Sequence, residues 1–177
     1  MQTRLLTRGK TSMKTIQKTR IYLPMAAMLL IAALAGSAAA ADKQVPFSGS
    51  LQAHEAIVSQ GPGTFVTDGS GGGIATHLGR FTVTWKFTVE VPAGTGSGPV
   101  RFIAANGDEL FMTAVGSSEP TVTPGVFHIT EIQIITGGTG RFAGAKGSFT
   151  VDRLTDLNTG FTSGSFHGTI TSPGAAH

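Results

Sequence analysis

The stretch from Ile134 to Phe149 reads I-I-T-G-G-T-G-R-F-A-G-A-K-G-S-F, and the predicted fold depends on it. Five of the eleven residues from position 137 to 147 are glycines, which allow left-handed or sharply turned backbone that a β-carbon would obstruct. Apolar strand patterns enter and leave the segment, and Phe142 is the only large apolar side chain between them. We therefore predict a tight, one-turn connection between two strands, with Phe142 closing one end of the core.

This run resembles a motif of the allene oxide cyclase and dirigent families, which is roughly T-G-G-S/T-G-x-F-x-x-A-x-G between two strands. The resemblance implies an eight-stranded barrel that is often trimeric. In those families the motif is architectural, so no catalytic residue comes with it. The residues that carry the resemblance are Thr136, Gly137, Gly138, Thr139, Gly140, Phe142, Ala145 and Gly147.

A dinucleotide-binding loop is the competing interpretation, because Gly138, Gly140 and Ala143 satisfy G-x-G-x-x-G/A after a strand. That motif requires a helix to follow it. Residues 148–151 instead read S-F-T-V, a strand pattern, and no helix-length period of 3.6 residues occurs further along the chain. The sequence therefore favours a strand connection over a nucleotide site.

The N-terminal segment has the three-part layout of a secretory signal peptide. Six Lys and Arg and no acid lie within the first twenty residues, and an uncharged run with a small-residue end follows. An A-x-A cleavage box ends at Ala40 or Ala41, and the alternative is an uncleaved membrane anchor. We predict a signal peptide at 1–41 and one domain at 42–177. The protein is then secreted or periplasmic, without a stable membrane span after cleavage.

The charge of the predicted mature part differs from that of the whole chain, which is +3. All ten acids lie at or after Asp42, whereas only seven of the thirteen Lys and Arg do, so this part carries −3. Nucleic acid is therefore not an expected partner. Because the chain contains no cysteine, its stability has to come from apolar burial and sheet hydrogen bonds.

Short alternating runs rich in Thr and Gly predict an all-β domain, which we interpret as a single antiparallel barrel of about eight strands. Gly79 to Val89 is the clearest strand, because apolar and polar residues alternate over its whole length. Asn106-Gly107 lies between two apolar runs and predicts a hairpin. Further strands are expected near 45–58, 125–136, 148–154 and 161–170.

Two glycine-rich segments are expected to lie outside the strands. Asp68 to Gly73 reads D-G-S-G-G-G and predicts a loop, with one short strand before it around Phe65 and Val66. Gly94 to Pro99 reads G-T-G-S-G-P and predicts a linker that ends the preceding strand.

A homo-oligomer is expected for two reasons. The strand at 125–136 is apolar on both faces, which suggests burial on both, as at a subunit interface. The family resemblance separately implies a trimer.

Glu55 is the sharpest candidate for a functional side chain. On the strand from Val45 to Val58 it shares a face with Phe47 and Leu51. A carboxylate that faces an apolar lumen could act as a base or hold a water molecule. The cyclase resemblance implies a glutamate in a similar position. The alternative is a glutamate at the rim that is paired with a basic residue.

Trp85, Phe87 and Phe102 are candidates for the wall of a site for an apolar small molecule. The alternative is that they fill the core, because an eight-stranded barrel is narrow enough for side chains to fill. Arg141 could face a ligand or neutralise a carboxylate, and the plainer interpretation is a solvated side chain.

No metal site or cofactor is predicted. The four histidines that precede the tail form neither H-x-H nor H-x-x-x-H. No G-x-S-x-G motif occurs, and a cysteine nucleophile is impossible. The catalytic residues, if there are any, stay unassigned.

Two classes of function remain open. The first, which we favour from the sequence, is an exported module without catalysis, an oligomeric scaffold whose lumen is packed solid. The second is a barrel that binds or isomerises a lipid-like or phenolic molecule in its lumen, cyclase-like if it is an enzyme. An open cavity of a few hundred Å3 that contains Glu55 would favour the second.

Overall fold

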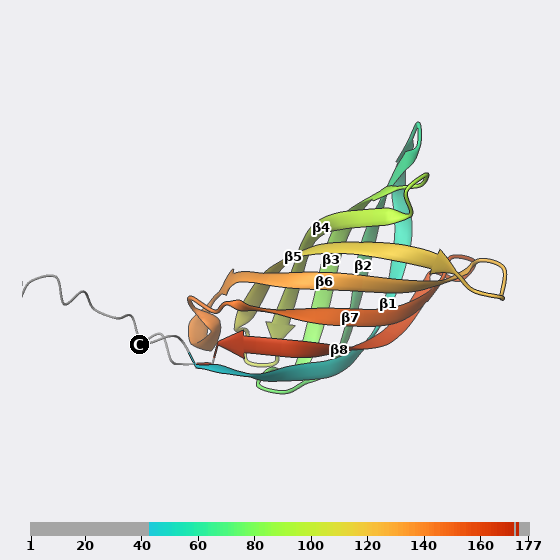
Figure 1. The fold of residues 1–177 in the computed structure, drawn as a ribbon. Coiled ribbons are helices and arrows are strands. Elements are labelled where there is room, and N and C mark those ends of the chain that lie inside the picture. Colours follow the sequence, from blue (N-terminus) through green and yellow to red (C-terminus); the bar gives the residue numbers. More distant parts are fainter. Residues whose placement is uncertain (1–42, 172, 174–177) are drawn as a thin grey trace, which may run out of the picture. The chain divides into compact units, whose positions relative to one another are not determined.

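The computed structural model describes residues 43–171 and 173, so the predicted signal peptide lies outside the described residues. The described strands form one closed antiparallel barrel in sequence order, in which β1 pairs with both β2 and β8 (Figure 1). This confirms the predicted barrel of about eight strands. No helix among residues 43–171 and 173 is long and apolar enough to cross a membrane. The strands are β1 (Gln44–Gly61), β2 (Thr64–Ala75), β3 (Gly79–Glu90), β4 (Thr95–Ala104), β5 (Glu109–Pro120), β6 (Val126–Gly138), β7 (Gly147–Asp156) and β8 (Phe161–Thr171).

The clearest sequence patterns lie where they were expected. The alternating run from Gly79 is β3, and its apolar residues from Phe81 to Phe87 are buried while the intervening ones are exposed. The predicted hairpin joins β4 to β5, and the backbone N–H of Ala104 donates to the carbonyl of Asp108 at 2.9 Å. Gly107 in this turn has φ of +88°, a conformation that suits glycine.

Both glycine-rich segments that were expected outside the strands are in fact strand. Asp68 to Gly73 lies in the middle of β2, paired with β1 on one side and β3 on the other. Most of Gly94 to Pro99 belongs to β4. The prediction was wrong because glycine weakens an isolated strand, whereas a closed barrel holds each strand between two hydrogen-bonded neighbours.

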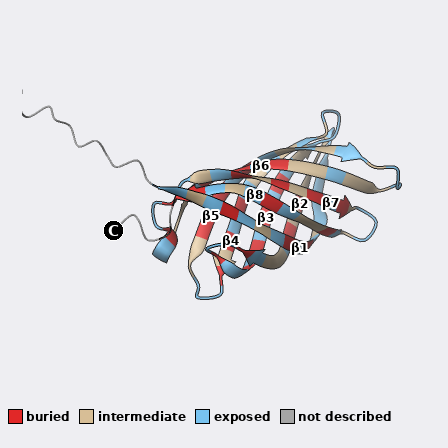
Figure 2. Cartoon of the chain, turned by 60° about the horizontal axis from the view of Figure 1, so that its bottom comes forward, coloured by how far each residue is buried: buried red, intermediate tan, exposed pale blue. Residues whose placement is uncertain are grey.

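These glycines make room for large side chains inside the barrel. Gly69 is the cross-strand partner of Trp85, and a β-carbon there would overlap the indole ring. Gly73 is the partner of Phe81, and its β-carbon would come within 2.8 Å of that ring. Burial alternates along the strands as Figure 2 shows, because one residue of each successive pair faces the lumen. The glycines of β2 therefore set which neighbouring side chains the lumen can hold.

The glycine run at residues 137–147 forms a plug at one end of the barrel. Its helical turn is the 3-10 helix η2 (Gly140–Phe142), and β7 begins soon after it. Phe142 is fully buried, as predicted. Among the described residues no helix of several turns follows the motif, which excludes the dinucleotide-loop geometry.

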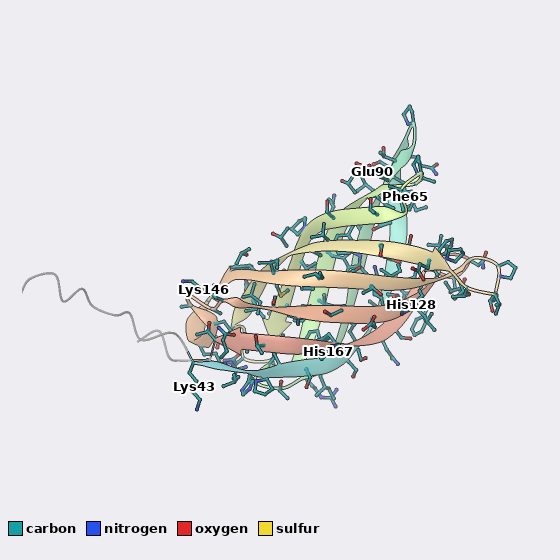
Figure 3. All side chains as sticks on the ribbon, viewed as in Figure 1. Lys43, Phe65, Glu90, His128, Lys146 and His167 are labelled. Atoms are coloured by element: carbon teal, nitrogen blue, oxygen red, sulfur yellow. The ribbon has the colours of Figure 1, made fainter. Side chains whose placement is uncertain are left out.

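The opposite end of the barrel is built differently. β1 pairs with β8 only as far as His54, so the rest of β1 continues as a hairpin with β2. This hairpin projects beyond the other strands in Figure 1. Figure 3 shows Phe65 and Glu90 near this end, away from Lys43 and Lys146 at the plug end. We call the end with Phe65 the open end.

Replacement of Phe142 by Ala tests whether the plug holds the barrel together. Since the ring is fully buried, we expect Phe142→Ala to lower the free energy of unfolding by about 3 to 5 kcal/mol. Urea unfolding would measure this loss. Phe111→Ala is the matched control, because Phe111 is 36% exposed and its partial burial predicts a smaller loss, of about 1 to 2 kcal/mol. Equal losses in the two variants would contradict the plug.

Gly140 tests the backbone of the same turn. Its φ is +53°, and a β-carbon would overlap the carboxylate of Asp108. We expect Gly140→Val to lose about 1 to 3 kcal/mol from backbone strain, and more from the overlap. Gly107→Val isolates the strain, because Gly107 has φ of +88° but a β-carbon added there would meet no atom within 4 Å. Thermal melts that place both variants at the wild-type temperature would refute this account.

Candidate ligand site in the barrel lumen

The half of the lumen next to the plug is packed with aromatic rings. Phe81 and Phe102 stack with their ring centroids 4.4 Å apart, and Phe149 and Phe166 lie 5.0 Å apart. Each of these rings is at most 5% exposed. Pairs at these distances are favourable beyond the area they bury. This half of the lumen therefore has no room for a ligand.

The other half contains a cavity of about 260 Å3 that lies toward the open end. Its wall is mainly apolar, which suits a small and largely apolar molecule. Residues of the wall come from strands and from the loops at the open end. The main apolar ones are Phe65, Phe87, Val89, Phe127, Ile129 and Leu157.

Three charged side chains also line this cavity and separate it from the packed half: Glu55 of β1, Glu131 of β6 and Arg153 of β7. Their side chains are 6%, 7% and 4% exposed. All three occupy positions that face the lumen in strands whose other inward residues are mostly apolar. We call this group the charged floor.

Hydrogen bonds connect the charged floor into one network. Arg153 Nε and Nη2 donate to Glu131 Oε1 at 3.1 and 2.8 Å, and Arg153 Nη1 donates to Glu55 Oε1 at 3.2 Å. The remaining carboxylate oxygens also accept bonds, Glu55 Oε2 from Trp85 Nε1 at 3.3 Å and Glu131 Oε2 from Gln133 Nε2 at 3.0 Å. Because buried charges are tolerated only when paired, Arg153 makes this arrangement possible.

The guanidinium stays charged in this environment. Burial alone would lower the pKa of Arg153, but the nearby charges of Glu131 and Glu55 and their hydrogen bonds outweigh burial and raise the pKa above its usual range. Arg153 also lies over the Trp85 ring, with its guanidinium carbon 5.3 Å from the ring centroid. It therefore acts as a permanent cation at the centre of the floor.

Glycines on neighbouring strands position this network. Gly164 of β8 is the cross-strand partner of Arg153, and a β-carbon there would lie 2.6 Å from Arg153 Cβ. Gly116 of β5 is likewise the cross-strand partner of Glu131, and a β-carbon added at Gly116 would lie 2.7 Å from Glu131 Cγ. Since β8 lies between β7 and β1, the missing side chain at Gly164 gives Arg153 room to lie beside β8 and reach Glu55.

The residues singled out from the sequence fall into different places. Glu55 and Phe87 line the cavity, and Trp85 lies beside the floor, where its indole N–H donates to Glu55. Phe102 lies in the packed half of the lumen. Arg141 lies on the plug, where it pairs with Asp108 at 3.6 Å and donates to the carbonyl of Leu78. The glycine motif as a whole is at the end remote from the cavity.

Sequence reasoning missed Arg153 and Glu131 as site residues. The signal was present in both strands, because each residue interrupts an inward face that otherwise carries apolar or uncharged groups. Glu55 was found by that same signal. Glu55 faces the lumen, as the functional interpretation predicted, and it also pairs with a basic residue, as the structural interpretation predicted.

No group of three or more His, Cys, Asp or Glu is placed to hold a metal ion within residues 43–171 and 173. His128 lies on the outer surface, 3.8 Å from Asp152. Apart from the charged floor, the polar side chains that line the cavity carry hydroxyl groups, such as those of Thr67 and Ser118.

Comparison with known proteins gives a structural similarity and no match in sequence. No protein-family model and no curated protein matches the sequence. Among solved structures, the chain is similar to a pterocarpan synthase dirigent protein. The two share 12% sequence identity with a TM-score of 0.49, over 75% of this chain and 93% of the other. That protein is a member of one of the two families that the glycine motif resembles.

Removal of the central cation tests the network. Arg153→Met would leave Glu55 and Glu131 buried without their partner, so we expect a loss of about 3 to 5 kcal/mol in the free energy of unfolding. Arg101→Met is the control, because Arg101 also pairs with a glutamate, Glu109, but is 47% exposed. That pair should contribute at most about 1 kcal/mol. Similar losses in the two variants, measured by urea unfolding, would show that the floor is not a buried ion-pair network.

Proposed function

We propose that this protein binds a small, largely apolar molecule in the open half of its lumen. The observation that supports this is the cavity of about 260 Å3 with an apolar wall and the charged floor. Such a combination of apolar wall and few convergent polar groups is typical of small-molecule sites. From the sequence alone we favoured a scaffold with a filled lumen, and the open cavity containing Glu55 now favours the binding alternative.

The charged floor also argues for binding over a purely structural role. Replacing a buried ion network by well-packed apolar residues is often neutral or stabilising. A filled scaffold therefore gives no stability reason to keep charged side chains at Glu55, Glu131 and Arg153. Residues that break a local rule of packing are expected at functional sites.

Confinement is the mode of action that the geometry supports best. Both carboxylates already accept hydrogen bonds from Arg153, Trp85 and Gln133. A cyclase-like isomerisation would additionally require one of them to exchange a proton with the ligand. The proposal is therefore a binding function, and it assigns no reaction.

Two further parts of the proposal concern the whole protein. We propose that residues 1–41 direct export, on the sequence pattern alone.

We also propose that the protein self-associates through the outer face of β5 and β6, where Val115 and Ile132 are cross-strand partners and are 56% and 53% exposed. Ile134 continues this face and is 46% exposed. An exposed apolar face of this kind is typical of an interaction surface, and a second copy of the protein would cover it.

Filling the cavity tests the binding function. Gly96 lines the cavity, and a β-carbon there would make only ordinary contact, 3.4 Å from Val89 Cγ2. We expect Gly96→Phe to fold and to abolish binding of 4-propylphenol, octan-1-ol and 4-phenylbutan-1-ol. Binding to the wild type would be followed through Trp85, the single tryptophan of the chain, which lies beside the floor. A ligand at about one hundred times its Kd should also stabilise the wild type by about 2.7 kcal/mol.

The control for this variant is Ser97→Phe, on the next residue of the same strand. Ser97 is exposed, so the added ring would leave the cavity open. We expect it to bind the probes as the wild type does. If no probe changes the Trp85 fluorescence or the melting temperature of the wild type at millimolar concentration, the binding function is wrong. Equal binding by Gly96→Phe and the wild type would place the site elsewhere.

A further inference from the structure

We infer that the cavity is selective for a ligand that carries a protonated amine on an apolar body, with the ammonium group placed against Glu55 and Glu131. This inference rests on the binding function proposed above and specifies the chemical class of the ligand. It follows from three properties of the cavity: the charge of its floor, the hydrogen bonds that the floor already makes, and an unpartnered hydroxyl group in the wall.

The charge of the floor is unbalanced. Glu55, Glu131 and Arg153 are the charged residues among those that line the cavity. With both carboxylates ionised, two negative charges face one guanidinium, and the floor carries a net charge of −1. All three side chains are at least nine-tenths buried, so solvent screens this charge poorly. A ligand with one positive charge would neutralise the floor.

The hydrogen bonds point to the same ligand chemistry. Arg153 has five N–H groups, and its three nitrogens already donate to Glu131, Glu55 and the hydroxyls of Thr155 and Thr162. A carboxylate has about four acceptor sites. Glu55 accepts two bonds and Glu131 accepts three. The floor therefore offers more free acceptors than donors.

Thr67 gives an independent indication of a polar ligand group. Thr67 lines the cavity, is 4% exposed, and its Oγ1 has no hydrogen-bond partner among the described residues. A buried hydroxyl without a partner is costly. An ammonium group has three donors and no acceptor, so its chemistry suits both this hydroxyl oxygen and the free carboxylate sites.

The rest of the cavity selects the body of the ligand. Phe65, Phe87 and Phe127 supply aromatic wall. The volume of about 260 Å3 lies just below the usual range for drug-sized ligands, about 300 to 1,000 Å3. A single ring on a short alkyl chain is of suitable size. A carboxylate on the same body would add a third negative charge to the floor, so it should be rejected.

Three probes of one shape test the inference: 4-phenylbutan-1-amine, 4-phenylbutan-1-ol and 4-phenylbutanoate. Their Kd values for the wild type would be measured at pH 7 by Trp85 fluorescence and by calorimetry. We expect the amine to bind at least about tenfold more tightly than the alcohol, as for a hydrogen bond to a charged group. The carboxylate should bind more weakly than the alcohol.

Glu55→Gln tests whether the floor causes this preference, since it removes one negative charge with little change in shape. The ratio of alcohol Kd to amine Kd should fall toward one. Glu119→Gln makes the same charge change at an exposed residue of β5 and should keep the wild-type ratio. If Glu55→Gln does not fold, the order of the three probes on the wild type still decides the question.

The outcomes separate this inference from the binding function. If the alcohol binds and the amine binds no better, the selectivity is wrong and the binding function stands. Tightest binding of the carboxylate would also overturn the selectivity. If none of the three probes binds at millimolar concentration, both the binding function and the inference fail. An amine preference that persists unchanged in Glu55→Gln would show that the charged floor is not its origin.

Discussion

A steric rule recurs between neighbouring strands of this barrel: several of the large side chains in the lumen face a glycine on the next strand. Trp85 faces Gly69, and Phe149 faces Gly168. Where the rule applies, a β-carbon on the glycine would come too close to the larger residue. An eight-stranded barrel has a lumen just wide enough for side chains to fill. Because every strand contributes inward positions, this alternation of large and small residues makes room for aromatic rings and an arginine in the same lumen.

This rule explains which parts of the fold could be predicted from the sequence. The alternation from Gly79, the Asn106-Gly107 turn and the plug around Phe142 are local signals, and a strand, a hairpin and a tight turn follow from them directly. The prediction of a loop at Asp68 to Gly73 was wrong because glycine clusters, which are usual in loops, here lie within a strand. The signal that could have corrected the interpretation is a period of two, since glycines stand at 69, 71 and 73, on one face of a strand. Reading it required knowledge that the neighbouring strand carries Trp85.

The candidate site was predictable only one residue at a time. A carboxylate on an apolar face identified Glu55, and the same reasoning applied to Arg153 would have marked a second inward charge. Their contact was not predictable, because they lie 98 residues apart in sequence and meet only when β8 closes the barrel between β7 and β1. The pairing depends on register as well. A shift of one residue in β7 would move Arg153 to the outer surface.

The charged floor links the stability of the barrel to the proposed ligand site. Phe142 and the stacked rings at the plug end bury their surface in a region that excludes ligand. Arg153 spans from β7 to β1 at the level of Trp85, so a ligand that enters from the open end meets charged groups before it meets the packed rings. An apolar group gains nothing by going deeper, because it would have to displace the hydrogen bonds of Arg153 to do so. Under the proposed binding function, the depth of binding and the polarity required of the ligand's inner end are therefore consequences of the same buried ion network.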